Sequence, residues 1–485
     1  MSSTLQRLTS SYAKHLPLAE DACKFLTASP DPFHAVAECV KKLEQAGFRA
    51  LQNKAAFTGN LEAGGKYYYT VHQSTLVAFT VGQKYVPGQG GFHVIGGHTD
   101  SPNLKVKPRS LKPPKNGCIM LGVECYGGGL WNTWFDRDLG ISGKILVRSP
   151  DGKIESKLVN ITDPVARVSN LCIHLQSGEE RKAFKVNKED HTSPILATEA
   201  EMKKVLEEST EEQLNKTEDS WKSQQEPLLL QLIAEKLGIP VEQIADFELN
   251  LYDTQGAALG GVAKEFLYSA RLDNLATVFV AMEAILAHTK DGLADDEDIK
   301  VVVFFDHEEV GSDSSHGAGS PVIEEAIRRI SAGLGSGADS PDLYAQTINK
   351  SFILSIDQAH AVHPNYAGKH EATHAPKMNA GLVIKTNQNQ RYATNGVTGF
   401  VLRELARMGS LPIQEFCVRN DCPCGSTIGP TISTRTGVRT VDAGMPQLSM
   451  HSCREVMGTM DLTHGVELFK TFFKRFRELD EKMDF

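Results

Sequence analysis

The hydrophobic pattern changes along the chain, and its outer parts combine helical and strand periodicity. The clearest helix is predicted after Asp31, a good N-cap followed by Pro32, where apolar residues recur at helical spacing until Gly47. The clearest strand is 301–305, a run of five apolar residues that ends abruptly at charged ones. Such a run is typical of a strand that is buried on both faces of a parallel sheet.

Further elements repeat these two patterns. Strands are predicted at 93–95, 247–252 and 351–356, and helices at 276–287 and 468–476. Helices that alternate with buried strands indicate an α/β fold with helices on both faces of the sheet, a three-layer α/β/α arrangement.

The middle of the chain has a different pattern of predicted elements, with strands and turns but few helices. From 105 to about 250, strand-like pieces such as 144–148 and 171–175 lie between Gly- and Pro-containing turns. The charged stretch 198–225 has helical propensity, but its composition favours a solvated face or a disordered insertion. With 485 residues, the chain exceeds the ~250–300 at which single cores stop growing. We therefore predict an α/β domain formed by 1–105 and 251–485, interrupted by a β-rich domain at 106–250.

Composition narrows the classes of partner and compartment. The net charge of -9 argues against nucleic acid or an anionic membrane surface as an electrostatic partner. No apolar run approaches the ~18–20 residues of a membrane span, and the N-terminus lacks the apolar core of a secretory signal. The nine cysteines show neither disulfide nor zinc-site spacing, so we expect a reducing compartment and place the protein in the cytoplasm. The serine-rich start leaves an organelle transit segment as an alternative to a frayed terminus.

Side chains of the kind that bind metal ions follow several of the predicted strands. They are His98, Asp100, Asp273, Glu308, Glu309, Asp357 and, later in the chain, His451. The carboxyl ends of strands form the ligand crevice of open α/β sheets. Imidazole together with carboxylate suits zinc, manganese or cobalt better than calcium or magnesium.

The number of these ligands indicates two ions rather than one. A pair of ions that shares a bridging carboxylate activates one water, as in dinuclear hydrolases. Of the adjacent Glu308 and Glu309, one would ligate while the other accepts the proton of that water. Alone, Asp273 reads better as a helix N-cap, His98 as a loop histidine and Asp357 as a turn residue. Their joint occurrence at strand ends favours the metal site.

Seven stretches carry a specific resemblance that extends from residue 29 nearly to the C-terminus. They are 96–107, 126–139, 271–275, 306–312, 359–366, 418–430 and 446–455. In these stretches the chain resembles the aspartyl aminopeptidases, a family of dinuclear metallo-exopeptidases. One departure is His307, where members of that family carry Asn, and we expect it to leave the metal ligands unaffected. The stretch 198–225 has no counterpart that we can align.

The resemblance implies a role for each candidate residue. It makes His98 and Asp357 ligands of one ion, Glu309 and His451 ligands of the other, and Asp273 the bridge between them. It makes Glu308 the general base and Asp100 its catalytic companion, the carboxylate that orients His98. The implied reaction is hydrolysis of an N-terminal peptide bond, with two divalent ions, zinc before manganese or cobalt.

The resemblance also implies how the substrate is held. Lys385 would bind an acidic first side chain, Asp or Glu, with His360 and Tyr392 beside it and with Glu308 and Asp357 against the peptide. His174 would enter the site of a neighbouring subunit. We expect the homo-oligomer to be a dodecamer built from dimers with tetrahedral symmetry, and the inserted domain at 106–250 to be the dimerisation domain. Without the resemblance, Lys385 reads as an exposed strand-end lysine and His174 as a packing residue.

Two other functions remain open at this stage. A related binuclear aminopeptidase of neutral specificity would keep the metal ligands but lack the interaction with Lys385. A metal-bound scaffold with vestigial activity would have no need of a base at Glu308.

Overall fold

The structure is a computed structural model that describes residues 4–200, 221–335 and 340–484. Its chain divides into two compact units. The first comprises 1–101, 257–450 and 455–485, and the second comprises 102–256 together with the short segment 451–454. The predicted charged segment 198–225 lies mostly outside the described residues.

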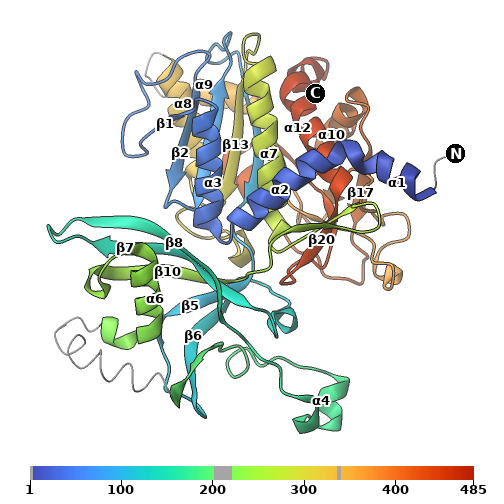
Figure 1. The fold of residues 1–485 in the computed structure, drawn as a ribbon. Coiled ribbons are helices and arrows are strands. Elements are labelled where there is room, and N and C mark those ends of the chain that lie inside the picture. Colours follow the sequence, from blue (N-terminus) through green and yellow to red (C-terminus); the bar gives the residue numbers. More distant parts are fainter. Residues whose placement is uncertain (1–3, 201–220, 336–339, 485) are drawn as a thin grey trace. The chain divides into compact units, whose positions relative to one another are not determined.

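A nine-stranded mixed sheet forms the centre of the first unit, and it confirms the predicted α/β fold (Figure 1). Its strands, in spatial order, are β1 (Arg49–Ala50), β2 (Lys66–Val71), β3 (Thr75–Val81), β13 (Ile299–Phe305), β4 (Phe92–His98), β14 (Phe352–Ile356), β18 (Arg439–Gly444), β16 (Leu382–Thr386) and β17 (Ile413–Cys417). The neighbours β13, β4, β14 and β18 run parallel to one another. All seven residues of β13 are buried, as the apolar run predicted.

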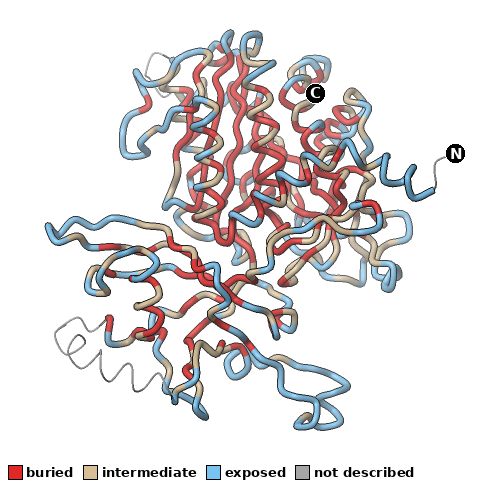
Figure 2. Tube along the Cα trace, in the orientation of Figure 1, coloured by how far each residue is buried: buried red, intermediate tan, exposed pale blue. Residues whose placement is uncertain are grey.

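Helices cover both faces of this sheet, and the strands between them are buried (Figures 1 and 2). One face packs against α2 (Leu16–Ala28), α3 (Pro32–Gln45), α7 (Leu272–Asp291), α10 (Gly396–Met408) and α12 (Thr459–Asp480). The other packs against α8 (Val322–Leu334), α9 (Pro341–Asn349) and α11 (Ile428–Thr436). Alternate residues of β13 enter the two cores, Val302 and Phe304 on one side and Val301 and Val303 on the other.

Helix α3 begins as its sequence predicted. The carboxylate of Asp31 accepts a hydrogen bond from the His34 amide at 3.0 Å, and Pro32 occupies the first turn. The chain leaves the helix at Gly47, whose φ of +79° is the left-handed conformation that glycine adopts at little cost. A short helix, α1 (Thr4–Tyr12), precedes these elements and has no buried residue.

A second sheet of five short strands also belongs to the first unit. It contains β11 (Ala258–Gly260), β12 (Phe266–Ser269), β20 (Glu455–Gly458), β19 (Pro446–Leu448) and β15 (Ala359–His360). Its strand β20 returns the chain to the first unit after the excursion at 451–454.

The second unit is built on a six-stranded sheet. Its strands are β8 (Ile154–Ala166), β7 (Leu139–Arg148), β10 (Ile244–Asp253), β5 (Asn103–Leu111), β6 (Cys118–Tyr126) and β9 (Ile195–Thr198), with α6 (Pro227–Leu237) packed in its core and a short helix α4 (Gly178–Lys182). The strand predicted at 171–175 is wrong, because Ile173–Leu175 forms a 3-10 turn with exposed side chains. The role of 106–250 as a dimerisation domain stays a prediction.

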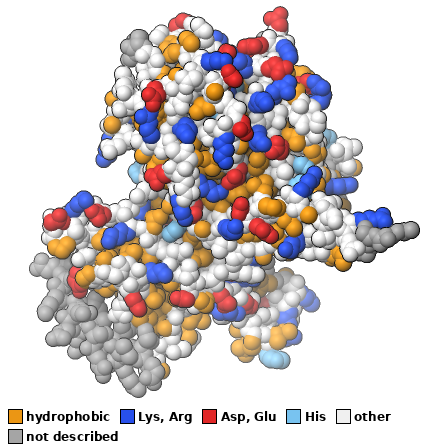
Figure 3. Space-filling model, turned by 45° about the horizontal axis from the view of Figure 1, so that its top comes forward, with side chains coloured by type: hydrophobic (Ala, Val, Ile, Leu, Met, Phe, Trp, Pro, Cys, Tyr) orange, Lys and Arg blue, Asp and Glu red, His pale blue; other side chains and the backbone are white. Residues whose placement is uncertain are grey.

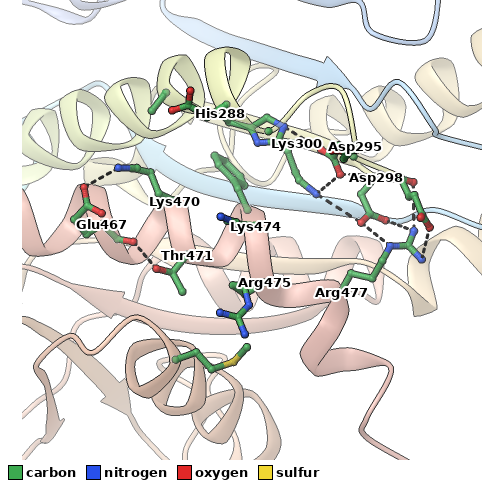
Figure 4. A pocket seen from close by; sticks show the side chains of 17 residues that line it. His288, Asp295, Asp298, Lys300, Glu467, Lys470, Thr471, Lys474, Arg475 and Arg477 are labelled. Atoms are coloured by element: carbon green, nitrogen blue, oxygen red, sulfur yellow. Dashed lines mark hydrogen bonds and ion pairs between the residues drawn. The ribbon is translucent and has the colours of Figure 1, made fainter.

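The amino end of β13 carries a buried charge network beside a pocket of about 760 Å³ (Figure 4). Lys300 donates to Asp296 at 2.8 Å and to Nδ1 of His93 at 2.9 Å. Nε2 of His93 lies 3.5 Å from Asp298, which accepts a hydrogen bond from Arg477 of α12 at 2.7 Å. Burial, and then the charge of Lys300, lowers the pKa of His93 to about 3.

Three further observations concern membrane spans, disulfides and surface charge. None of its helices combines the length and the hydropathy needed to traverse a bilayer. No disulfide joins any of the nine cysteines, all of which lie within the described residues. On the face of the protein that Figure 3 shows, basic and acidic side chains are interspersed.

Candidate active site

Three adjacent parallel strands bring most of the candidate ligands to one edge of the large sheet. His98 is the last residue of β4 and pairs with Phe305, the last residue of β13. Glu308 follows β13 by a short turn, and Asp357 directly follows β14 on the other side of β4. The carboxyl ends of neighbouring parallel strands thus place these side chains around a single point, as the sequence predicted.

Asp273 reaches the same point from the start of α7. The backbone is not yet helical there (φ -82°, ψ 104°), and Oδ1 of Asp273 lies 3.3 Å from Nε2 of His98. The same imidazole nitrogen lies 3.5 Å from Oδ1 of Asp357 and 3.9 Å from Oε2 of Glu308. The position of Asp273 against His98 is not what helix capping alone would require.

Asp100 holds two parts of the site in place. Its Oδ1 accepts a hydrogen bond from the Glu308 amide and its Oδ2 one from the Glu309 amide, both at 3.1 Å. Nδ1 of His98 lies 3.0 Å from the Asp100 carbonyl and 3.4 Å from Oδ1 of its carboxylate. Since Nδ1–H is directed at Asp100, the Nε2 lone pair of a neutral His98 faces the other carboxylates.

The electrostatics of this edge favour a cation. Burial would lower the pKa of His98, but hydrogen bonds to Asp100, Asp273 and Asp357 hold it well above its usual value. Burial raises the pKa of Glu308 to about 8, opposed by His98 and reinforced by the negative charge of Asp357. A carboxylate cluster of this kind gains stability from any positive charge placed within it.

The donor set fits a divalent ion. One ligand atom each of His98, Asp273 and Glu309 lies within 4.8 Å of the other two. One imidazole with carboxylates is a zinc-type set, and Asp357 adds a further oxygen 3.5 Å from the His98 nitrogen. His98, Asp273, Glu309 and Asp357 are therefore the residues that would hold metal at this edge of the sheet.

His451 belongs to the second unit, in the segment 451–454. Its Nδ1 lies 3.0 Å from the carbonyl oxygen of Gly128, a contact that leaves Nε2 of a neutral imidazole as the acceptor. This tautomer suits a metal ligand, and the assignment of His451 to the second ion stays a prediction.

Lys385 is buried, so its interpretation as an exposed strand-end lysine is wrong. Only 2% of its surface is accessible, and its ammonium group donates to the Gln358 carbonyl at 3.1 Å. Nζ also lies 3.5 Å from Oδ2 of Asp357 and 5.1 Å from the centre of the Tyr392 ring. The structure thus brings Lys385 and the buried Tyr392 next to a candidate metal ligand.

Of the two remaining candidates, only His360 lies near these residues, since burial and then the charge of Lys385 lower its pKa to about 4. His360 is in β15, where its ring stacks on Phe416 with 5.4 Å between ring centres. His174 lies in the 3-10 turn of the second unit and is exposed, so it is not a packing residue within its own chain. It is flanked by Ile173 and Leu175, which are 58% and 71% exposed.

Three residues support the site without having been singled out from the sequence. The Asn274 amide accepts from the His98 backbone at 3.1 Å and donates to Asp357 at 3.2 Å. Glu455 accepts a hydrogen bond from the Asp273 amide at 3.1 Å, and the Ser101 hydroxyl donates to the Asp273 carbonyl at 2.6 Å. All three lie in stretches that carry the family resemblance, but nothing in the sequence showed that they would contact Asp273, His98 or Asp357.

Comparisons with known proteins agree in the family that they indicate. The model of the aminopeptidase I zinc metalloprotease (M18) family matches residues 25–473. A probable aspartyl aminopeptidase of Ricinus communis is 45% identical and covers 98% of each chain, and an aspartyl aminopeptidase of Dictyostelium discoideum is 43% identical over 96% of this chain and 98% of its own.

Solved structures give the same result. A chain in the cryo-EM structure of the Ape4 and Nbr1 complex superposes with a TM-score of 0.91 at 40% identity, over 98% of this chain and 88% of that one. A chain of the S. cerevisiae mApe1 dodecamer superposes with a TM-score of 0.82 at 30% identity, over 96% of this chain and 98% of that one.

Proposed function

The chain belongs to the aminopeptidase I zinc metalloprotease (M18) family, and from this premise we propose that it is a dinuclear aminopeptidase that removes N-terminal Asp or Glu from peptides. Metallo-aminopeptidase activity follows from the family. The number of ions, the acidic specificity and the role of each residue are the parts that we propose.

The observation that carries the proposal is the different placement of two neighbouring glutamate side chains, Glu308 and Glu309. Glu309 converges with His98 and Asp273 on one point, while the carboxylate of Glu308 lies 3.9 Å from Nε2 of His98. Asp100 fixes both backbone amides, so the two side chains keep distinct positions. A ligand and a base side by side are what hydrolysis by an activated water requires.

The chemistry then divides among the residues of this chain. Two divalent ions, when bound by His98, Asp357, Asp273, Glu309 and His451, would polarise the scissile carbonyl and acidify the attacking water. Glu308 accepts the proton of that water and returns it to the leaving amine.

Selectivity for an acidic first residue is assigned to Lys385. Its ammonium group lies near Asp357 in a buried position beside Tyr392, where an added carboxylate would find a partner that water screens little. Both curated relatives cited above carry the name aspartyl aminopeptidase, which supports this assignment. His360 and Asp357 complete the proposed substrate contacts.

Self-association is part of the same proposal. The solved S. cerevisiae relative is a dodecamer, and we propose a homo-oligomer of that kind, with His174 reaching the active site of a neighbouring subunit. The exposed apolar residues Ile173 and Leu175 beside it support an interface at this turn. Zinc as the physiological ion and the cytoplasm as the location complete the proposal.

The test compares the hydrolysis of aspartyl and leucyl chromogenic substrates after metal has been stripped and zinc, manganese or cobalt restored. We expect metal-dependent turnover that strongly favours the aspartyl substrate. In Lys385→Met, kcat/KM for the aspartyl substrate should fall by about 10–100-fold, which corresponds to the free energy of one hydrogen bond to a charged group. The kcat/KM for the leucyl substrate should change little. A dominant leucyl activity would overturn the specificity, and no turnover with any metal would overturn the proposed reaction.

A further inference from the structure

We propose that Asp306, His307 and His316 form an additional binding site for a divalent transition-metal ion of the zinc class, separate from the hydrolytic centre. The three residues lie in the turn region between β13 and α8, in the first unit. They share no residue with the cluster of His98, Asp273 and Glu309.

The distances between the ligand atoms match the size of such an ion. Oδ2 of Asp306 lies 3.8 Å from Nε2 of His307 and 3.6 Å from Nε2 of His316. One ligand atom of each residue lies within 4.8 Å of the other two. Bonds of about 2.0–2.1 Å in tetrahedral geometry place ligand atoms roughly 3.3 Å apart, so the two distances from Asp306 are only a few tenths of an ångström too long.

Two serine hydroxyls lie beside the outer nitrogens of the imidazoles, where they can accept from Nδ1–H in the tautomer that binds metal through Nε2. Nδ1 of His307 lies 2.8 Å from the Ser314 hydroxyl, and Nδ1 of His316 lies 3.1 Å from the Ser315 hydroxyl. In both rings the Nε2 atom is the one that faces Asp306. Ligating histidines in proteins have this arrangement, in which a second hydrogen bond fixes the outer nitrogen.

The backbones of the ligands are also fixed. The Thr75 hydroxyl accepts a hydrogen bond from the Asp306 amide at 3.0 Å and donates to the His316 carbonyl at 2.6 Å. The site is therefore anchored to the first residue of β3 and needs little ordering to bind an ion. The side chain of Asp306 is 4% exposed, whereas those of His316 and His307 are 15% and 24% exposed, which leaves a path for an ion to enter.

The donor set selects the class of ion. Two imidazoles and one carboxylate suit zinc, cobalt or nickel and disfavour magnesium and calcium. The ring of His72, in the turn before β3, lies tilted 4.6 Å from the His316 ring, so a further imidazole is close to this site. An ion here would tie the turn that carries Glu308 and Glu309 to β3, a structural rather than a hydrolytic role.

The experiment counts metal ions in the intact protein. After chelation and removal of the chelator, the protein is titrated with Co²⁺ or Zn²⁺ and the bound metal is measured by mass spectrometry and, for Co²⁺, by visible absorption. We expect one more ion per chain in the wild type than in His316→Gln. Ser314→Ala keeps all three ligands but removes the hydroxyl beside Nδ1 of His307, which also accepts from the Gly317 amide, and it should weaken the affinity for this ion by about 10–100-fold.

The control is His191→Gln, which removes an exposed histidine of the second unit and should bind as the wild type does. Equal stoichiometry and equal cobalt spectra in wild type, His316→Gln and Ser314→Ala would overturn the proposal. A loss of the additional ion in the two variants, with retention of the hydrolytic ions, would establish it. Because the readout is metal content, a failure of the proposed peptidase activity would not be mistaken for a failure of this site.

Discussion

At the scale of single residues, Asp100 connects the candidate ligands and the candidate base. It accepts hydrogen bonds from the amides of Glu308 and Glu309 and is also directed at Nδ1 of His98. The proposed base and a proposed ligand are therefore positioned by the same side chain. This arrangement joins the end of β4 to the turn after β13, and its precision depends on the pairing of those two strands.

The first prediction concerns Glu308 as the base. In Glu308→Gln the amide cannot accept a proton, so we expect kcat to fall by about 10²–10⁴-fold, while metal content and assembly stay as in the wild type. Turnover, bound metal and sedimentation are measured on the same sample. Glu324→Gln, in α8 and paired with Arg328, is the matched control and should keep full activity. Turnover above a tenth of the wild-type value would rule out Glu308 as the base.

The sequence allowed the charged candidates to be located, but not their partners. His98, Glu308 and Asp357 could be found because each follows an apolar strand. The contacts of Asn274 and Glu455 could not, since they depend on how α7 and β20 approach the sheet edge. The burial of Lys385 was missed for the same reason, because local periodicity does not reveal which strands flank β16.

At the scale of elements, apolar runs and caps were the reliable signals. The strand β13 and the start of α3 at Asp31 lie where the sequence placed them. The strand predicted at 171–175 failed, since its apolar residues face outward and do not pair with another strand in the described chain. Alternation of apolar and polar residues thus predicts burial only where a neighbouring element is available to provide it.

The second prediction concerns the network that joins β4, β13 and α12. His93 has a folded pKa of about 3, below its unfolded value of about 6.5. Between these two values the unfolded chain binds a proton at His93 and the folded chain does not. The contribution of the neutral imidazole to the free energy of unfolding is therefore fully present above pH 6.5 and is lost as the pH falls toward 3. The free energy of unfolding should drop by up to about 1.4 kcal/mol per pH unit in this range.

Urea unfolding at pH 7 and pH 5 measures this effect. In His93→Gln the amide oxygen still accepts from Lys300 but no longer titrates, so the loss of stability between the two pH values should shrink by up to about 2 kcal/mol. His191→Gln, at an exposed site, should leave the wild-type pH dependence unchanged. An identical pH dependence in all three proteins would show that His93 is not responsible.

At the scale of the whole molecule, the exposed apolar turn at Ile173–Leu175 requires an explanation. Leu175 is 71% exposed in the single chain. It is next to His174, the residue proposed to enter another subunit. If a partner subunit covers an apolar side chain in this position, the assembly is stabilised by about 25 cal/mol for each Å² of apolar surface buried.

The corresponding prediction uses Leu175→Asp. A carboxylate buried at a subunit contact would be costly, so we expect this variant to sediment as a smaller species and to lose activity because His174 no longer reaches a neighbouring site. Leu175→Met keeps the apolar contact and should assemble normally. If Leu175→Asp sediments as the wild type does, the turn is not an interface.

The division of the chain into units has a consequence for its synthesis. Residues 451–454 complete the second unit, where the Cys453 amide donates to Thr133 at 2.8 Å and Arg454 donates to the Gln255 carbonyl at 2.8 Å. On a ribosome that adds ~5–20 residues per second, this segment emerges about 10–40 s after residue 256. The second unit can therefore be completed only when most of the chain has been synthesised. A chain that is terminated before residue 451 lacks this closing segment, which includes His451.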